Sequence, residues 1–155
     1  MGRVVASVDV PGHASEAEAL WYDPVRWASW VDGFGHALTV PEGWPAEGTL
    51  QWISLPEGRG RVHETVTSYE PRAGQSLAVE DSRLRGTQRV EFTPGAEAVK
   101  VALTLEYELK QRTPLTPLID GLFVRREIAA SLRRTLARFA RERRGDLELE
   151  AEASR

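Results

Sequence analysis

The segment EAVKVALTLEYELK, residues 97–110, alternates between apolar and polar side chains along its length. Its apolar face carries Val99, Val101, Leu103, Leu105, Tyr107 and Leu109. A period of two is typical of a β-strand with one buried face, so this segment predicts a strand that covers a core.

The residues after this strand predict a long helix. From Thr113 to Arg144 the apolar side chains recur at a spacing of three and four, as in an amphipathic helix. They are Leu115, Leu118, Ile119, Leu122, Phe123, Ala129, Leu132, Leu136, Phe139 and Ala140. Gly145 is the expected C-cap, and the acidic residues 146–155 are expected to form a flexible tail.

The residues before this strand predict six more strands. They span residues 3–10, 34–41, 48–55, 60–70, 75–82 and 84–93. Most of the connections are short and rich in proline or glycine, which favours antiparallel pairing. Two short helices are expected between the first two strands, because the Asp23–Pro24 pair interrupts the helical pattern there.

This order of elements predicts an α+β fold in one domain, residues 1–145. One helix cannot cover both faces of a seven-stranded antiparallel sheet. The economical arrangement is a strongly curved sheet that grips the long helix, with the two short helices after the first strand closing one end. Such a geometry leaves a cavity between sheet and helix wherever the inward side chains do not fill it.

The composition excludes several classes of protein. The 155 residues contain no cysteine, which excludes a disulfide scaffold, a cysteine nucleophile and a thiolate-bound metal. The formal charge of −3 does not favour nucleic acid, so no DNA partner is expected. No apolar run approaches the ~20 residues of a membrane span. We expect a cytoplasmic monomer or homodimer with neither metal nor cofactor.

Three stretches resemble a known family. They are residues 19–30, ALWYDPVRWASW, residues 60–72, GRVHETVTSYEPR, and the C-terminal helix. Over roughly residues 3–144 the chain resembles the START-like, helix-grip (SRPBCC) superfamily, and within it the polyketide cyclase/dehydrase-like branch. The resemblance implies a deep cavity for a lipid, a polyketide or another apolar small molecule. It does not imply one chemistry, because members include aromatase/cyclases as well as binding proteins.

Five aromatic residues are candidates for lining this cavity. Trp27 and Trp30 lie three apart on the second short helix, and the others are Trp52, Tyr107 and Phe123. Aromatic walls bind flat apolar ligands through contact area and offset stacking. The same side chains could instead fill the core, and both interpretations stay open.

Polar residues on apolar strand faces form the second set of candidates. Glu64 alternates with two valines, and Asp81 and Gln88 fall on the inward faces of the next two strands. A carboxyl, an amide and Tyr107 around an apolar pocket could orient a carbonyl and move a proton. Alternatively, Glu64 pairs with an arginine, Asp81 lies in water at a strand end, or a bulge reverses either assignment.

Three functions fit these features. The leading hypothesis is binding of a hydrophobic or aromatic small molecule between sheet and helix. The second is a polyketide cyclase or dehydratase in which Glu64, Gln88 or Tyr107 assists proton transfer, with no catalytic residue assigned beyond these candidates. The third is an interaction module that docks the arginine-rich helix face, with Arg133, Arg134, Arg138 and Arg141, on an acidic partner or RNA, although a merely solvated face is the simplest alternative.

Overall fold

The computed structural model describes residues 1–56, 58–110 and 120–155. In this part of the chain, seven antiparallel strands form one sheet in the order β1-β7-β6-β5-β4-β3-β2. The strands are β1 (Gly2–Pro11), β2 (Phe34–Thr39), β3 (Thr49–Ser54), β4 (Arg61–Glu70), β5 (Gly74–Glu80), β6 (Leu84–Pro94) and β7 (Ala98–Leu109). The predicted strands are confirmed to within a few residues at each end.

The strand with the regular alternation, β7, lies inside the sheet. β7 pairs with β1 on one side and with β6 on the other, so that Val101 faces Val8 and Phe92 across the two ladders. Its odd-numbered side chains from Val99 to Tyr107 are all buried, as the alternation predicted.

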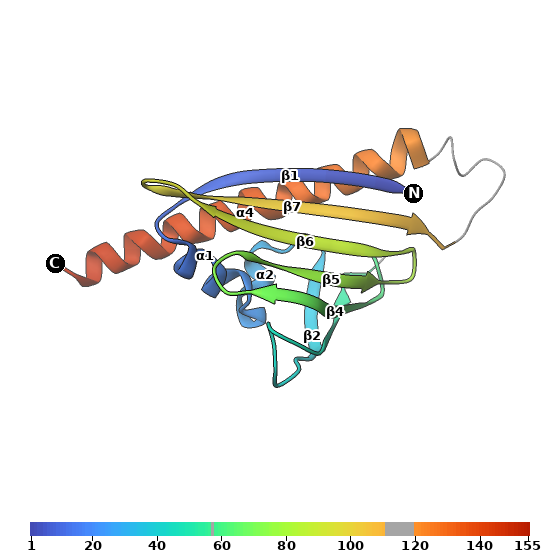
Figure 1. Cartoon of the computed structure of the whole chain (residues 1–155), viewed down its shortest axis with the longest axis horizontal. Coiled ribbons are helices and arrows are strands. Elements are labelled where there is room, and N and C mark those ends of the chain that lie inside the picture. The colour runs from blue at the N-terminus through green and yellow to red at the C-terminus, as the bar shows by residue number, and fades with distance from the viewer. Residues whose placement is uncertain (57, 111–119) are drawn as a thin grey trace.

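The helices lie against one face and one end of this sheet. Between β1 and β2 come α1 (Ala14–Trp21), a single 3-10 turn η1 (Pro24–Arg26) and α2 (Trp27–Trp30). A π-helical turn η2 (Asp120–Val124) leads into the long helix α4 (Arg125–Ala153). α4 runs along the sheet against β1, and α1 and α2 lie at one end (Figure 1). The predicted helix-grip arrangement is confirmed.

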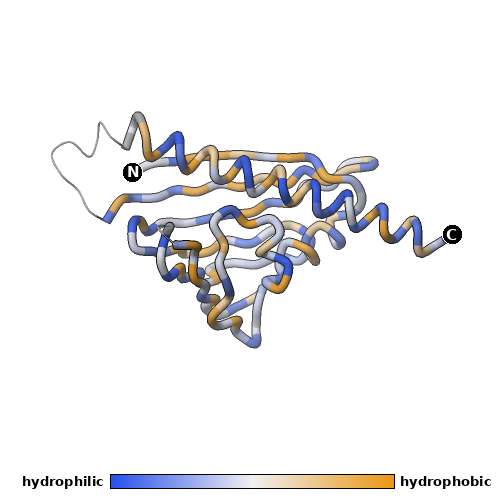
Figure 2. Tube along the Cα trace, turned by 180° about the vertical axis from the view of Figure 1, so that it is seen from behind, coloured by the Kyte–Doolittle hydropathy of each residue, from blue (hydrophilic) through white to orange (hydrophobic). Residues whose placement is uncertain are grey.

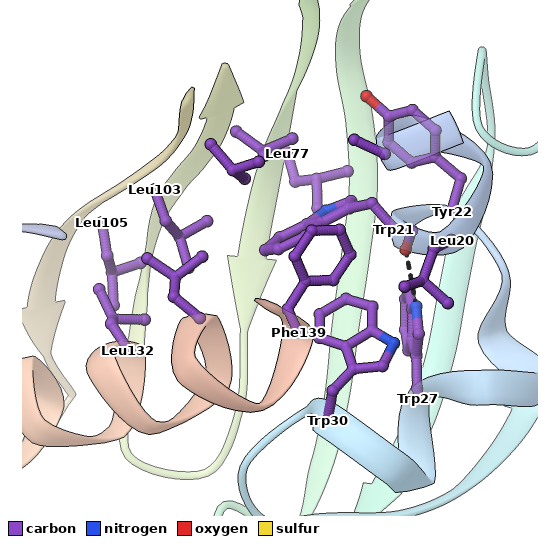
Figure 3. Packing of buried hydrophobic residues seen from close by; sticks show 14 of the residues in the cluster. Leu20, Trp21, Tyr22, Trp27, Trp30, Leu77, Leu103, Leu105, Leu132 and Phe139 are labelled. Carbon is purple, nitrogen blue, oxygen red and sulfur yellow. Dashed lines mark hydrogen bonds between the residues drawn. The ribbon is translucent and has the colours of Figure 1, made fainter. Parts of the chain in front are cut away.

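Apolar residues of α4 alternate with polar ones along the helix, as Figure 2 shows from the other side. Phe139 of α4 packs into an aromatic cluster with the short helices, whereas Leu132 lies beside Leu103 and Leu105 of β7 (Figure 3). The ring centroids of Trp21 and Trp30 are 4.7 Å apart, and Phe139 lies 5.1 Å from the first and 5.0 Å from the second. This end of the space between sheet and helix is therefore filled by side chains.

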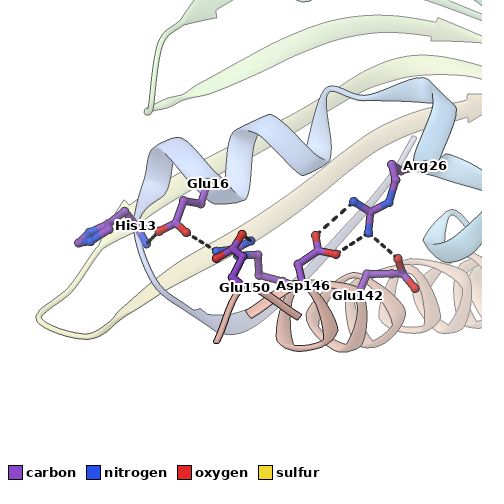
Figure 4. A network of polar contacts seen from close by, with 7 residues as sticks. His13, Glu16, Arg26, Glu142, Asp146 and Glu150 are labelled. Atoms are coloured by element: carbon purple, nitrogen blue, oxygen red, sulfur yellow. Dashed lines mark hydrogen bonds and ion pairs between the residues drawn. The ribbon is translucent and has the colours of Figure 1, made fainter. Parts of the chain in front are cut away.

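The end of the long helix differs from the prediction. Gly145 does not terminate α4, which continues to Ala153. A glycine C-cap needs a positive φ, and Gly145 does not have one. Arg26, from the turn before α2, binds Glu142 at 2.8 Å and Asp146 at 2.9 Å, on either side of Gly145 (Figure 4). These ion pairs join residues far apart in the chain, so local spacing does not reveal them.

Candidate ligand-binding cavity

A cavity of about 890 Å³ lies where the first turns of α4 face the sheet. The connection after β3 and the turn between β5 and β6 form its other walls. We call it the outer cavity. Its larger aliphatic side chains come from the sheet, the connection after β3, η2 and α4, and are Leu55, Leu84, Leu105, Leu109, Val124, Ile128 and Leu132.

The outer cavity leads to a much smaller space of about 60 Å³, which we call the inner chamber. The two spaces share five lining residues, namely Asp32, Arg59, Gln88, Ser131 and Leu132. The inner chamber ends against the aromatic cluster. Its volume holds only a few water molecules or a small polar group, so the body of a ligand belongs in the outer cavity.

Most of the predicted site residues meet at the inner chamber. Trp27, Trp30, Trp52, Glu64 and Gln88 all line it, and Gln88 also reaches the outer cavity. The three tryptophans are buried and contact other rings, so they build the closed end of the cavity as well as the core. The two interpretations of these aromatics are therefore compatible.

Two predicted residues lie elsewhere. Tyr107 is buried beside Gly2, its partner on β1, and a Cβ at Gly2 would collide with the tyrosine ring. Phe123 is 63% exposed, outside the core. It precedes Leu132 by nine residues, or two and a half helical turns, so a helix that buries Leu132 turns position 123 towards the opposite side.

Glu64 is the buried carboxyl of the inner chamber. It lies on β4 opposite Leu50 of β3 and Val79 of β5, and it is only 6% exposed. Burial raises the pKa of the Glu64 carboxyl, and the nearby Arg59 charge and Trp52 indole only partly oppose this rise. Glu64 is thus a protonated donor over a wider pH range than an exposed glutamate.

Asp81 is also buried, and its carboxylate accepts hydrogen bonds from the turn between β5 and β6. Its Oδ1 accepts hydrogen bonds from the backbone N–H groups of Arg83, at 2.7 Å, and Leu84, at 3.0 Å. Its Oδ2 accepts from Nε of Arg59 at 2.6 Å. The carboxylate is 2% exposed and engaged at both oxygens, so it stays inward although it follows the end of a strand.

Sequence reasoning missed Arg59, which lines both the outer cavity and the inner chamber. Its guanidinium carbon lies 5.4 Å from the centre of the Trp52 ring, within the range of a cation–π contact. The available signal was a lone arginine between Gly58 and Gly60, directly before a strand with an inward carboxyl. No periodicity applies in such a connection, so the pattern did not reveal its direction.

Asp32 lies where the outer cavity and inner chamber meet. Its carboxylate accepts from Ser131 Oγ at 2.7 Å, from Arg134 Nη2 at 3.0 Å and from Arg138 Nη1 at 3.2 Å. Burial alone would raise the pKa of Asp32, but the Arg134, Ser131 and Arg138 contacts outweigh it and hold the pKa below its usual value. This cluster joins the loop after α2 to α4 at the cavity wall.

The same contacts bear on the arginine-rich face of the helix. Arg134 and Arg138 bind Asp32, and Arg143 is buried against Glu16 and Glu150. Several of the arginines that suggested a docking surface thus hold α4 to the rest of the protein, whereas Arg133 and Arg141 are exposed.

Within residues 1–56, 58–110 and 120–155, no cluster of three histidine or acidic side chains is arranged to hold a metal ion. In the same ranges, no helix is both long and apolar enough to cross a membrane.

Residues 1–143 match the model of a protein family described as polyketide cyclase / dehydrase and lipid transport. The chain belongs to this family. The resemblance noted in the sequence is therefore confirmed. Comparison with curated protein sequences gave no match.

Solved structures share the fold of this polyketide cyclase/dehydrase family member. TTHA0849 from Thermus thermophilus is 19% identical, with a TM-score of 0.69 over 89% of this chain and 97% of that one. DynU16, a protein of the dynemicin biosynthetic locus, is 20% identical, with a TM-score of 0.65 over 90% of this chain and 46% of its own. Norcoclaurine synthase from Thalictrum flavum is 11% identical, with a TM-score of 0.64 over 92% and 96% of the two chains. At such identities the likeness concerns the fold alone.

Proposed function

We propose that this chain binds a hydrophobic or aromatic small molecule in the outer cavity between the sheet and α4. The observation that carries the proposal is the cavity itself, with its volume of about 890 Å³ and the aliphatic side chains of the sheet and α4 that line it. Ligand pockets of ~300–1,000 Å³ with apolar walls and a few polar groups are the usual sites for drug-sized molecules. The family's description, which names polyketides and lipids, agrees with an apolar guest.

Two aliphatic residues of α4 offer a matched test. Ile128 lines the outer cavity and is half-buried, whereas Leu149 lies further along the same helix and is 65% exposed. A library of lipids and aromatic polyketides is screened by native mass spectrometry, and hits are titrated by calorimetry. Because an indole at position 128 occupies ligand space, Ile128→Trp should weaken binding by about tenfold or more, and Leu149→Trp should leave it unchanged. Equal affinities in the two variants, or a library without a hit, would refute the proposal.

A second candidate function is a cyclase or dehydratase reaction that uses Glu64 for proton transfer. It is favoured by one specific feature, a buried carboxyl with a raised pKa at the inner end of the cavity. Gln88 lines the same space and could orient a substrate carbonyl beside this carboxyl.

Glu64→Gln separates the two functions, because glutamine keeps the shape of the side chain and cannot release a proton. If the chain is an enzyme, this variant should bind the substrate and lose most of the turnover, by ~10²-fold or more for a lost acid/base. Turnover that persists in Glu64→Gln would exclude the proton-transfer role. A polyketide synthase gene next to this one would direct the choice of substrates.

A further inference from the structure

The side chain of Arg59 is held in place from several directions. Its Nε donates to Asp81 at 2.6 Å, and its guanidinium lies over the ring of Trp52. Its own backbone carbonyl accepts from the N–H of Ser82 at 3.2 Å and from the Ser82 hydroxyl at 2.9 Å. These contacts tie the connection before β4 to the turn after β5. The guanidinium is therefore fixed where the outer cavity meets the inner chamber.

Asp81 occupies only one of the donor groups of Arg59. The contact runs from Nε of Arg59 to Oδ2 of Asp81, whose other oxygen accepts hydrogen bonds from two backbone N–H groups. Among the described residues, no hydrogen bond engages the Nη1 and Nη2 groups of Arg59. These two nitrogens present parallel N–H groups whose spacing matches the two oxygens of a carboxylate.

The charges around this position permit a bound anion. Asp32, a carboxylate that lines both spaces, is already paired with Arg134 and Arg138 of α4. Glu127 also lines the outer cavity, but it lies on the exposed side of α4. Glu64, which lines the inner chamber together with Arg59, is buried, and burial favours its neutral form, which does not repel an anion.

We infer that the ligand is an apolar or aromatic carboxylic acid, bound with its carboxylate on the Nη groups of Arg59 and its apolar body in the outer cavity. The inference rests on the proposed function and adds the chemistry of the head group. Leu105, Leu109 and Ile128 receive the apolar body, while Asp81 acts as a positioning residue that aims Arg59.

The experiment compares carboxylic acids with their primary amides, which have nearly the same shape and no charge. The pairs are 2-naphthoate, 4-biphenylcarboxylate and dodecanoate, each with its amide, and binding is titrated by calorimetry at pH 7. At least one acid should bind about tenfold or more tightly than its amide, since a hydrogen-bonded charge pair supports a difference of that order. Arg59→Gln should abolish this preference, and Arg59→Lys should restore little of it, because lysine lacks the planar fork.

Arg61→Gln is the matched control, because Arg61 is exposed and precedes the fully buried Val62 on β4, so it points away from the cavity. It should keep the preference of the unmodified protein. If acids and amides bind equally, or if Arg59→Gln keeps the preference, the inference is wrong although the proposed function stands. If no compound of either kind binds in the cavity, both fall.

Discussion

Replacing Glu64 by glutamine should change how stability depends on pH. Glu64 is 6% exposed, and burial raises the pKa of its carboxyl in the folded protein. In the unfolded chain the same group has an ordinary pKa. The folded state therefore holds the proton more tightly, and the stability that this proton supports is complete below the unfolded-state pKa and is lost as pH rises towards the folded-state pKa.

The size of the effect follows from proton linkage. Between the two pKa values, the folded protein keeps one proton that the unfolded chain has released. Each pH unit in that window then lowers the free energy of unfolding by about 1.4 kcal/mol relative to a side chain that does not titrate. Glu64→Gln is such a side chain, and all other groups cancel in the comparison. The free energy of unfolding of Glu64→Gln should therefore rise relative to that of the unmodified protein from about pH 4.5 upward, until the folded-state pKa is reached.

The assay is urea unfolding of both proteins at half-unit steps from pH 4.5 to 8. Glu80→Gln is the control, because Glu80 lies on the neighbouring strand β5, is exposed, and has its pKa lowered by its hydrogen bond and charge contact with Lys110. The free energy of unfolding of Glu80→Gln should not rise relative to that of the unmodified protein as the pH increases. A free-energy difference for Glu64→Gln that is constant across the range, or that shrinks as pH rises, would show that Glu64 does not carry a raised pKa.

Three further changes test other parts of the structure by chemical denaturation. Asp32→Asn should cost about 1–3 kcal/mol at pH 7 because it weakens charged hydrogen bonds to α4. Since the pKa of Asp32 is lowered, the unmodified protein should lose this contribution as the pH falls through the folded-state pKa, and an equal deficit at pH 7 and pH 2 would contradict the assignment. Phe139→Ala should cost about 3–5 kcal/mol, because it empties the centre of the aromatic cluster, and a loss below 1 kcal/mol would mean that the cluster is loosely packed. Gly145→Ala should stabilise by about 0.5–1 kcal/mol, since a Cβ there meets no atom within 4 Å, whereas destabilisation would indicate a left-handed C-cap.

The regular elements were predictable because their signals are local. Alternation placed Glu64 and Asp81 on inward faces of their strands, and both are buried, since a strand sends successive side chains to opposite sides. The order of strands and helices was enough to predict a curved sheet around one helix. The helical spacing was misleading for Phe123. It placed this residue on the apolar face of the long helix, although position 123 lies on the side opposite to Leu132.

The tertiary structure alone decided where the cavity lies and what it presents. Aromatic side chains from α1, α2 and α4 fill one end of the space between sheet and helix, and this leaves the outer cavity at the other end. Arg59 enters the site from a connection between strands, held by Asp81 from a distant turn. Its position depends on contacts between residues far apart in the chain, and such contacts leave no periodic trace in the sequence. Periodicity determined which faces of the strands and helices point inward. Long-range packing determined which part of that inward surface borders the outer cavity.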